Sequence, residues 1–244
     1  MKIKKLSYLF LFFIVSSSSL AQNSSTEKES YTWFDSKVGI ENTPLYNGVE
    51  YIDFEQGENS FKKFLFSGDF QKSMIEYENQ RYFDIPLKYD VFNDQIIIKL
   101  STEQKTTILQ LFKEKVAAFQ IGSKSFQHIK NLSIKDDSEA LSGFYEVVYN
   151  SSQIQLLKKY RKTQLREIRK RKLYFKYKFK TPFYYVMYNQ NVYEVKNQRD
   201  FIKIFPELKN IIQEVSVDRS LRNSNPDAYM LAYINQINVL LSKK

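Results

Sequence analysis

Hydrophobic and polar residues alternate over much of the chain between residues 46 and 195. In the clearest run, residues 83–91, the odd-numbered positions are apolar and most even-numbered positions are charged, which is typical of a strand with one buried face. Asn93-Asp94 predicts a turn, and residues 95–100 predict the strand that returns from it. Pro86 lies inside the first strand and lacks an N–H, so this strand is expected at a sheet edge or with a bulge at that point.

The same period of two predicts a series of further strands, several of them joined by turn residues such as Asn47-Gly48 and Asn150-Ser151-Ser152. Residues 164–172 form a charged connector whose conformation the pattern does not predict. The predicted strands are residues 49–54, 60–66, 70–77, 106–112, 116–121, 124–129, 143–149, 154–161, 173–180, 183–188 and 192–195.

Beyond residue 195 the apolar period changes to 3.6, which indicates helices. Asn197 is suited to cap a helix that begins near Gln198, and Asn225-Pro226 is suited to open the last one. Strands followed by helices predict an α+β fold, mainly antiparallel over about residues 46–195, with helices over about 198–241 packed on one face or end of the sheet. The apolar stripe of the last helix is expected to comprise Ala228, Leu231, Ala232, Ile234, Ile237 and Leu241.

The N-terminal segment has the order of a cleavable signal peptide. Three lysines precede the apolar run 9–15, and Ser19-Leu20-Ala21 places small residues before a cut between Ala21 and Gln22. The apolar run is far shorter than the roughly 20 residues that a membrane span requires. We therefore expect export to the periplasm or to the periplasmic side of the outer membrane, and no transmembrane span in the mature chain.

These patterns divide the chain into four parts: the signal peptide 1–21, a lead-in 22–44, a β-rich region 45–195 and a helical region 196–244. The lead-in is polar and aperiodic, and it is expected to be extended and partly disordered, with Trp33 and Phe34 as its bulky anchors. The β-rich and helical regions are expected to form one compact unit.

Composition adds two constraints. The chain has no cysteine but 20 Phe and 18 Tyr, so its stability must come from packing of large side chains rather than from disulfides. Without the three N-terminal lysines, 34 basic residues remain of 37, against 27 acidic ones, which is a net charge of +7. The mature chain is therefore basic.

The basic residues are concentrated in one segment, residues 158–180, where only Glu167 opposes them. If 173–180 is a strand, Lys176, Lys178 and Lys180 share a face with Tyr174, while Leu173, Phe175, Tyr177 and Phe179 face inward. Such a surface attracts polyanions, or alternatively its lysines protect an exposed sheet edge from aggregation. We call the following residues the basic stripe: Lys158, Lys159, Arg161, Lys162, Arg166, Arg169, Lys170, Arg171, Lys172, Tyr174, Lys176, Lys178 and Lys180.

The residue types of the chain give little support for a catalytic site or a metal site. His128 is the only histidine, and without cysteine a zinc site or a nucleophilic triad has few candidate members. Asp90, Asn93 and Asp94 could offer oxygens to calcium, but their spacing lacks the EF-hand pattern and Asn and Asp also favour tight turns. The sequence indicates no catalytic residue, metal ligand or cofactor. This favours a protein that is not an enzyme and leaves an enzyme as the alternative.

Three stretches together resemble a group of uncharacterised secreted proteins of Bacteroidetes-type bacteria. They are residues 42–48 (NTPLYNG) with Tyr51, residues 87–94 (LKYDVFND), and residues 143–146 (GFYE) leading into 156–159 (LLKK). The resemblance implies a Gram-negative periplasm or outer-membrane periphery, and it implies no activity.

Three hypotheses on function follow. The first is a non-enzymatic binding or accessory protein of the cell envelope that contacts a partner through an aromatic-rich sheet and the basic stripe. Its partner would be an envelope protein complex or an anionic lipid or lipopolysaccharide surface, and no nucleic acid is expected after export. The second is a periplasmic carrier of a lipid or other anionic ligand, and the third is a carboxylate-based hydrolase.

Overall fold

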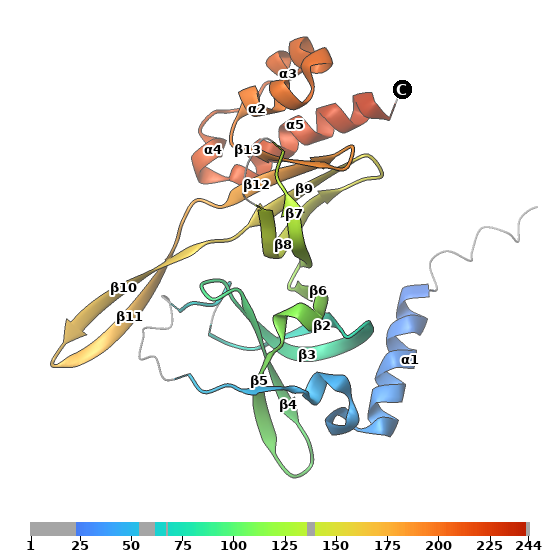
Figure 1. Cartoon of the computed structure of the whole chain (residues 1–244), viewed down its shortest axis with the longest axis vertical. Helices are drawn as coiled ribbons and strands as arrows, with labels where there is room; N and C mark the ends of the chain where they lie inside the picture. Colours follow the sequence, from blue (N-terminus) through green and yellow to red (C-terminus); the bar gives the residue numbers. More distant parts are fainter. Residues whose placement is uncertain (1–22, 54–61, 67, 136–139, 243–244) are drawn as a thin grey trace, which may run out of the picture.

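The structure is a computed structural model that describes residues 23–53, 62–66, 68–135 and 140–242 (Figure 1). The expected signal peptide and its cleavage site between Ala21 and Gln22 lie outside these residues. None of the helices in the described parts combines the length and the apolar character that crossing a bilayer requires.

Eleven strands of the described chain form one sheet with antiparallel ladders, in the order β1-β5-β4-β3-β2-β6-β7-β8-β9-β12-β13. With helices at the C-terminal end, this confirms the α+β prediction. The strands are β1 (Gly48–Glu50), β2 (Gln71–Tyr77), β3 (Gln80–Asp90), β4 (Gln95–Ser101), β5 (Thr106–Leu111), β6 (Val116–Ile121), β7 (Lys124–Ser133), β8 (Ala140–Asn150), β9 (Ile154–Lys159), β12 (Phe183–Tyr188) and β13 (Asn191–Val195).

Two predicted strands are wrong in extent. The one at 49–54 is reduced to β1, and the described part of the one at 60–66 makes a bridge only through Phe64 to Asp90. Elsewhere in the described chain, β10 (Lys162–Arg169) and β11 (Lys172–Phe179) pair only with each other, as a hairpin that leaves the sheet (Figure 1).

Strand β3 lies between β4 and β2, so it is not an edge strand despite Pro86. The β2–β3 register shifts by one residue between Ser73 and Ile75, and Asp84 there has a positive φ of 56°. The bulge alternative is therefore the correct one. The β3–β4 ladder begins at Leu87, just beyond the proline, so the missing N–H of Pro86 costs no hydrogen bond to β4.

The first core is built on the inner faces of strands β2 to β8. The sheet must curve, because side chains from all of these strands meet in the same core. Tyr89 lies at its centre, with ring centroids 5.4 Å from Phe119, 5.4 Å from Phe126 and 5.9 Å from Phe144. Phe119 and Phe126 stack on each other at 4.6 Å. The aromatic residues thus fill this core by packing against one another.

The second core lies between β9, β12, β13 and the C-terminal helices (Figure 1). These helices are α2 (Gln198–Ile204), α3 (Lys209–Glu214), α4 (Leu221–Ser224) and α5 (Pro226–Leu241). Asn197 caps α2 in a capping box with Asp200, and Asn225 caps α5, both as predicted. The predicted stripe of α5 is only half right, because Ala228, Leu231 and Ala232 are half-buried whereas Tyr229, Met230 and Tyr233 are buried beside Ile234, Ile237 and Leu241.

The lead-in is not extended. Residues Asn23–Val38 form helix α1, and Gly39 follows it with a positive φ of 81° that glycine adopts at little cost. Helix α1 is attached to β3 through exposed ion pairs, Lys28–Asp84 and Glu27–Arg81. Trp33 and Phe34 are not its anchors, since they are 63% and 49% exposed. Its contacts with β3 include these ion pairs, a hydrogen bond from Gln80 to Asp35 and one ring contact between Tyr31 and Phe83, and the helix has no long apolar stripe that the sequence pattern could indicate.

Candidate functional site in the β10–β11 hairpin

Most of the basic stripe lies on the β10–β11 hairpin. Its register pairs Arg169 with Lys172 across a two-residue turn, and directly opposed residues share a face. One face, here the basic face, carries Arg169, Lys172, Tyr174, Lys176 and Lys178 together with Glu167, Leu165 and Thr163. The opposite face, here the aromatic face, carries Ile168, Leu173, Phe175, Tyr177 and Phe179 together with Arg166, Gln164 and Lys162.

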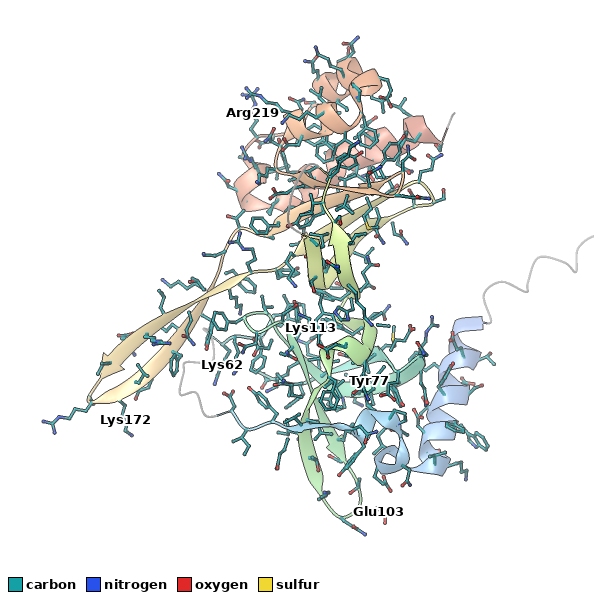
Figure 2. The ribbon with its side chains drawn as sticks, viewed as in Figure 1. Lys62, Tyr77, Glu103, Lys113, Lys172 and Arg219 are labelled. Carbon is teal, nitrogen blue, oxygen red and sulfur yellow. The ribbon has the colours of Figure 1, made fainter. Side chains whose placement is uncertain are left out.

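The separation of the lysines from the aromatic residues follows the predicted alternation, but the inward packing does not. Of the aromatic face, Tyr177 is buried, whereas Leu173 and Phe179 are 46% and 53% exposed. The reason is that the hairpin leaves the sheet and none of the described elements covers its outer part (Figure 2). The connector 164–172, whose conformation the pattern did not predict, forms most of β10, the turn of this hairpin and the first residue of β11.

The base of the hairpin is held firmly against the body. The Tyr177 ring meets the Phe92 ring edge-on at 5.0 Å, and Gln164 donates a hydrogen bond to the Tyr177 hydroxyl at 2.6 Å. Lys162 Nζ donates to the carbonyl oxygens of Lys62 and Phe64, at 2.7 and 2.5 Å. Burial lowers the pKa of Lys162 to about 8. Lys162 is therefore an anchoring residue rather than part of a free basic surface.

Three further members of the basic stripe also have structural roles. Lys158 is buried, with Nζ 2.7 Å from Asp227 Oδ2 and 3.8 Å from Glu146 Oε2. Lys159 Nζ lies 2.9 Å from Asp94 Oδ1, and the guanidinium of Arg161 stacks 3.9 Å above the Phe183 ring. Both lysines belong to β9, an inner strand between β8 and β12, so the sheet and its coverings enclose them. The stripe is not one continuous surface.

The two residues in the turn of the hairpin are of types that rarely adopt the backbone conformation found there. Lys170 and Arg171 have φ values of 48° and 64°, the left-handed conformations of a two-residue turn that favours Asn-Gly. A non-glycine residue held there costs of order 1 kcal/mol. Two cations thus occupy positions where other residues would give a more stable hairpin.

Next to this turn, exposed aliphatic side chains adjoin the cations. Ile168 is 76% exposed and lies opposite Leu173, while Arg169 and Lys172 project from the other face. We call residues 168–173 the hairpin tip, and Figure 2 shows Lys172 at its outer end. Hydrogen bonds from Arg169 and Lys176 lower the pKa of Glu167 to about 2, so Glu167 stays negatively charged. It is the one acidic residue among residues 162–180, which contain nine basic residues. The tip therefore combines a strong positive potential with apolar side chains in water.

The residues weighed for catalysis or metal binding are engaged in internal contacts. The buried Asp90 carboxylate accepts hydrogen bonds from the Phe92 and Asn93 N–H groups and from the Asn93 amide, as an Asx turn does. Asp94 accepts from the Tyr89 hydroxyl at 2.6 Å and pairs with Lys113 and Lys159. His128 Nδ1 lies 3.0 Å from the Val116 carbonyl oxygen. These contacts favour the turn interpretation of Asp90 and Asp94.

Leu165 and Ile168 were missed by sequence reasoning because they lie within the charged connector, where they do not alternate. Pairing residues 162–169 with 172–179 about a two-residue turn would have found them. Comparison of the chain with protein-family models, with curated proteins and with solved structures finds no match.

Proposed function

We propose that this chain is a peripheral binding protein of the bacterial cell envelope, and that its hairpin tip docks on an anionic lipid surface. The observation that carries the proposal is the exposed Ile168 and Leu173 pair beside four consecutive cations, residues 169–172. The signal peptide expected at residues 1–21 supports export, which would bring the tip to envelope lipids.

The chemistry of the tip favours a lipid bilayer over an acidic protein. Cations near an anionic bilayer contribute about 1 kcal/mol each, and an aliphatic side chain moved from water to hydrocarbon contributes about 1.5–3 kcal/mol. A bilayer surface offers both environments within a few ångströms, so it can take up Ile168 and the cations together. An acidic protein surface would pair the cations and leave Ile168 in water, unless it also offered a matching apolar pocket.

Two observations weigh against the other hypotheses. A carrier would arrange its aromatic residues around a ligand, whereas Phe119, Phe126 and Phe144 pack directly on Tyr89. A carboxylate-based hydrolase would need carboxylates that face a cleft, whereas the buried Asp90 holds a turn and the half-buried Asp94 holds two lysines in place.

Vesicle binding tests the proposal. The chain from Gln22 is expected to co-sediment with phosphatidylglycerol vesicles and not with phosphatidylcholine vesicles. Binding is expected to fall steeply with salt, since the Debye length shrinks from about 8 Å at physiological ionic strength to about 3 Å at 1 M. Replacing Lys170 and Arg171 together (Lys170→Asn with Arg171→Gly) removes two cations and should weaken binding roughly 30-fold.

This double variant has an advantage over simple neutralisation, because Asn-Gly suits the backbone of the turn and preserves the hairpin. The matched control replaces exposed lysines on β2 and β4 (Lys72→Gln with Lys99→Gln), which removes the same charge away from the tip and should leave binding within about twofold. Equal loss in both variants would show that net charge, and not the tip, governs binding. Normal binding together with aggregation of the triple variant Lys176→Gln, Lys178→Gln, Lys180→Gln would assign those lysines to edge protection.

A further inference from the structure

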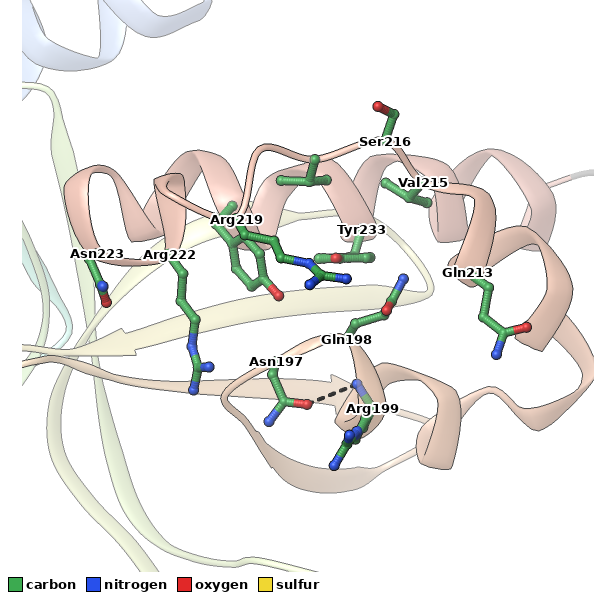
Figure 3. A pocket seen from close by; sticks show the side chains of 12 residues that line it. Asn197, Gln198, Arg199, Gln213, Val215, Ser216, Arg219, Arg222, Asn223 and Tyr233 are labelled. Atoms are coloured by element: carbon green, nitrogen blue, oxygen red, sulfur yellow. Dashed lines mark hydrogen bonds between the residues drawn. The ribbon is translucent and has the colours of Figure 1, made fainter.

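A second basic site lies in the helical region, away from the hairpin. A cleft of about 800 Å³ opens between the start of α2, the segment after α3, α4 and the first turns of α5. Figure 3 shows the guanidinium groups of Arg199, Arg219 and Arg222 around this opening, with the Asn197 amide among them. Among the described residues, no carboxylate lines the cleft, and its other polar side chains are amides, a serine and two tyrosines.

The three arginines are available to a ligand. Among the ion pairs formed within the described ranges, none involves Arg199, Arg219 or Arg222, although Arg81 and Arg169 have such partners. The carboxylates next to Arg199 and Arg219 in the sequence accept backbone hydrogen bonds. Asp200 accepts the N–H groups of Lys196 and Asn197, and Asp218 accepts the Ser220 N–H.

The cleft is held in shape by its own hydrogen bonds. Arg222 N–H donates to the Arg219 carbonyl, so these side chains leave the same side of one turn. Gln198 ties the start of α2 to α3 by donating to the Ile212 carbonyl at 2.8 Å. Tyr229 and Tyr233 are buried at the floor, with their ring centroids 5.3 Å apart. Burial raises the pKa of Tyr233, so its hydroxyl stays neutral.

We propose that this cleft binds a phosphate ester of a small polar molecule, with Arg199, Arg219 and Arg222 contacting the phosphate oxygens. Each guanidinium presents a planar fork of hydrogen-bond donors that suits phosphate. The guanidinium groups approach from two sides, so they suit an anion with more than two acceptor oxygens better than a single carboxylate. The volume lies within the range of small-molecule sites and exceeds the size of inorganic phosphate. The amides of Asn197, Gln213 and Asn223 would contact the hydroxyl groups of the ester.

Calorimetry with glycerol 3-phosphate tests this inference on the chain from Gln22. Saturable binding is expected, with weaker binding of inorganic phosphate, which cannot reach the amides. The double variant Arg219→Gln with Arg222→Gln should weaken binding of glycerol 3-phosphate roughly tenfold or more, because it removes charged hydrogen bonds. The control Lys203→Gln with Lys209→Gln removes two exposed cations from α2 and α3 and should change it less than about twofold.

A lipid headgroup could supply the same phosphate chemistry. Phosphatidylglycerol vesicles distinguish the two sources when they are added to the Lys170→Asn, Arg171→Gly variant, in which the hairpin tip is weakened. Residual vesicle binding that depends on Arg219 and Arg222 would assign the phosphate to lipid, and binding of glycerol 3-phosphate alone would assign it to a soluble ester. Absence of saturable binding in both arms, or equal loss in the arginine and lysine variants, would overturn the inference.

Discussion

The Gly143→Ala variant is expected to lose more than about 3 kcal/mol of its free energy of unfolding. Gly143 has a φ of 110°, and a Cβ there would lie 2.0 Å from Asp94 Oδ2 and 2.7 Å from Lys159 Nζ. Asp94 would have to move, which would leave Lys113 and Lys159 without their carboxylate. Breaking a buried ion pair costs about 3–5 kcal/mol; the lower end applies here, because the side chains of Asp94 and Lys159 are 16% and 17% exposed, and the backbone strain adds about 1 kcal/mol.

Urea denaturation measures this loss, and Gly122→Ala provides the matched control. Gly122 also has a positive φ, of 60°, but a Cβ there meets its nearest atoms only at 3.9 Å. The control variant should therefore show the conformational cost alone, about 1 kcal/mol. Equal losses for the two alanine variants would contradict the role assigned to Asp94 and its two lysines.

The second large effect is expected at Lys158, which connects the sheet to α5. Replacement by methionine keeps most of the side-chain volume and leaves Asp227 without its ammonium partner, at a cost of about 3 kcal/mol in urea denaturation. Lys196→Met is the control. The Lys196 Nζ lies 2.8 Å from the Glu194 carboxylate, but the Lys196 side chain is 59% exposed. Exposed pairs contribute less than about 1 kcal/mol. If Lys158→Met proved as mild as this control, the Lys158–Asp227 contact would not hold α5 to the sheet.

The sheet and the later helices were predictable because each has one buried face, which appears in the sequence as a regular period of apolar residues. The hairpin of β3 and β4 shows this in Phe83 to Val91, and the capping residues Asn197 and Asn225 indicate where α2 and α5 begin. Helix α1 was missed for the opposite reason, since its contacts with β3 include ion pairs that leave no apolar period.

The candidate sites were predictable only in part. The cations of the basic stripe are close together in the sequence, so their concentration was evident. Which of them are buried depends on whether their strand lies inside the sheet, as for Lys158 and Lys159 on β9, or beyond it, as in the β10–β11 hairpin. Arg219 and Arg222 lie on one turn, but Arg199 comes from a separate segment that only the packing of the helices brings beside them. The contact between Gly143 and Asp94 could not be predicted from a local sequence pattern either, because it depends on the curvature of the sheet.

The most direct test of lipid docking places a fluorescent reporter at the hairpin tip. In a Trp33→Phe background, which removes the only native tryptophan, Ile168→Trp should shift its emission to the blue when phosphatidylglycerol vesicles are added, and lipids brominated in their acyl chains should quench it. The same reporter in the β4–β5 turn, Glu103→Trp, should do neither (Figure 2). Vesicle-bound protein in which the Ile168→Trp reporter keeps the emission of an indole in water would contradict insertion of the tip.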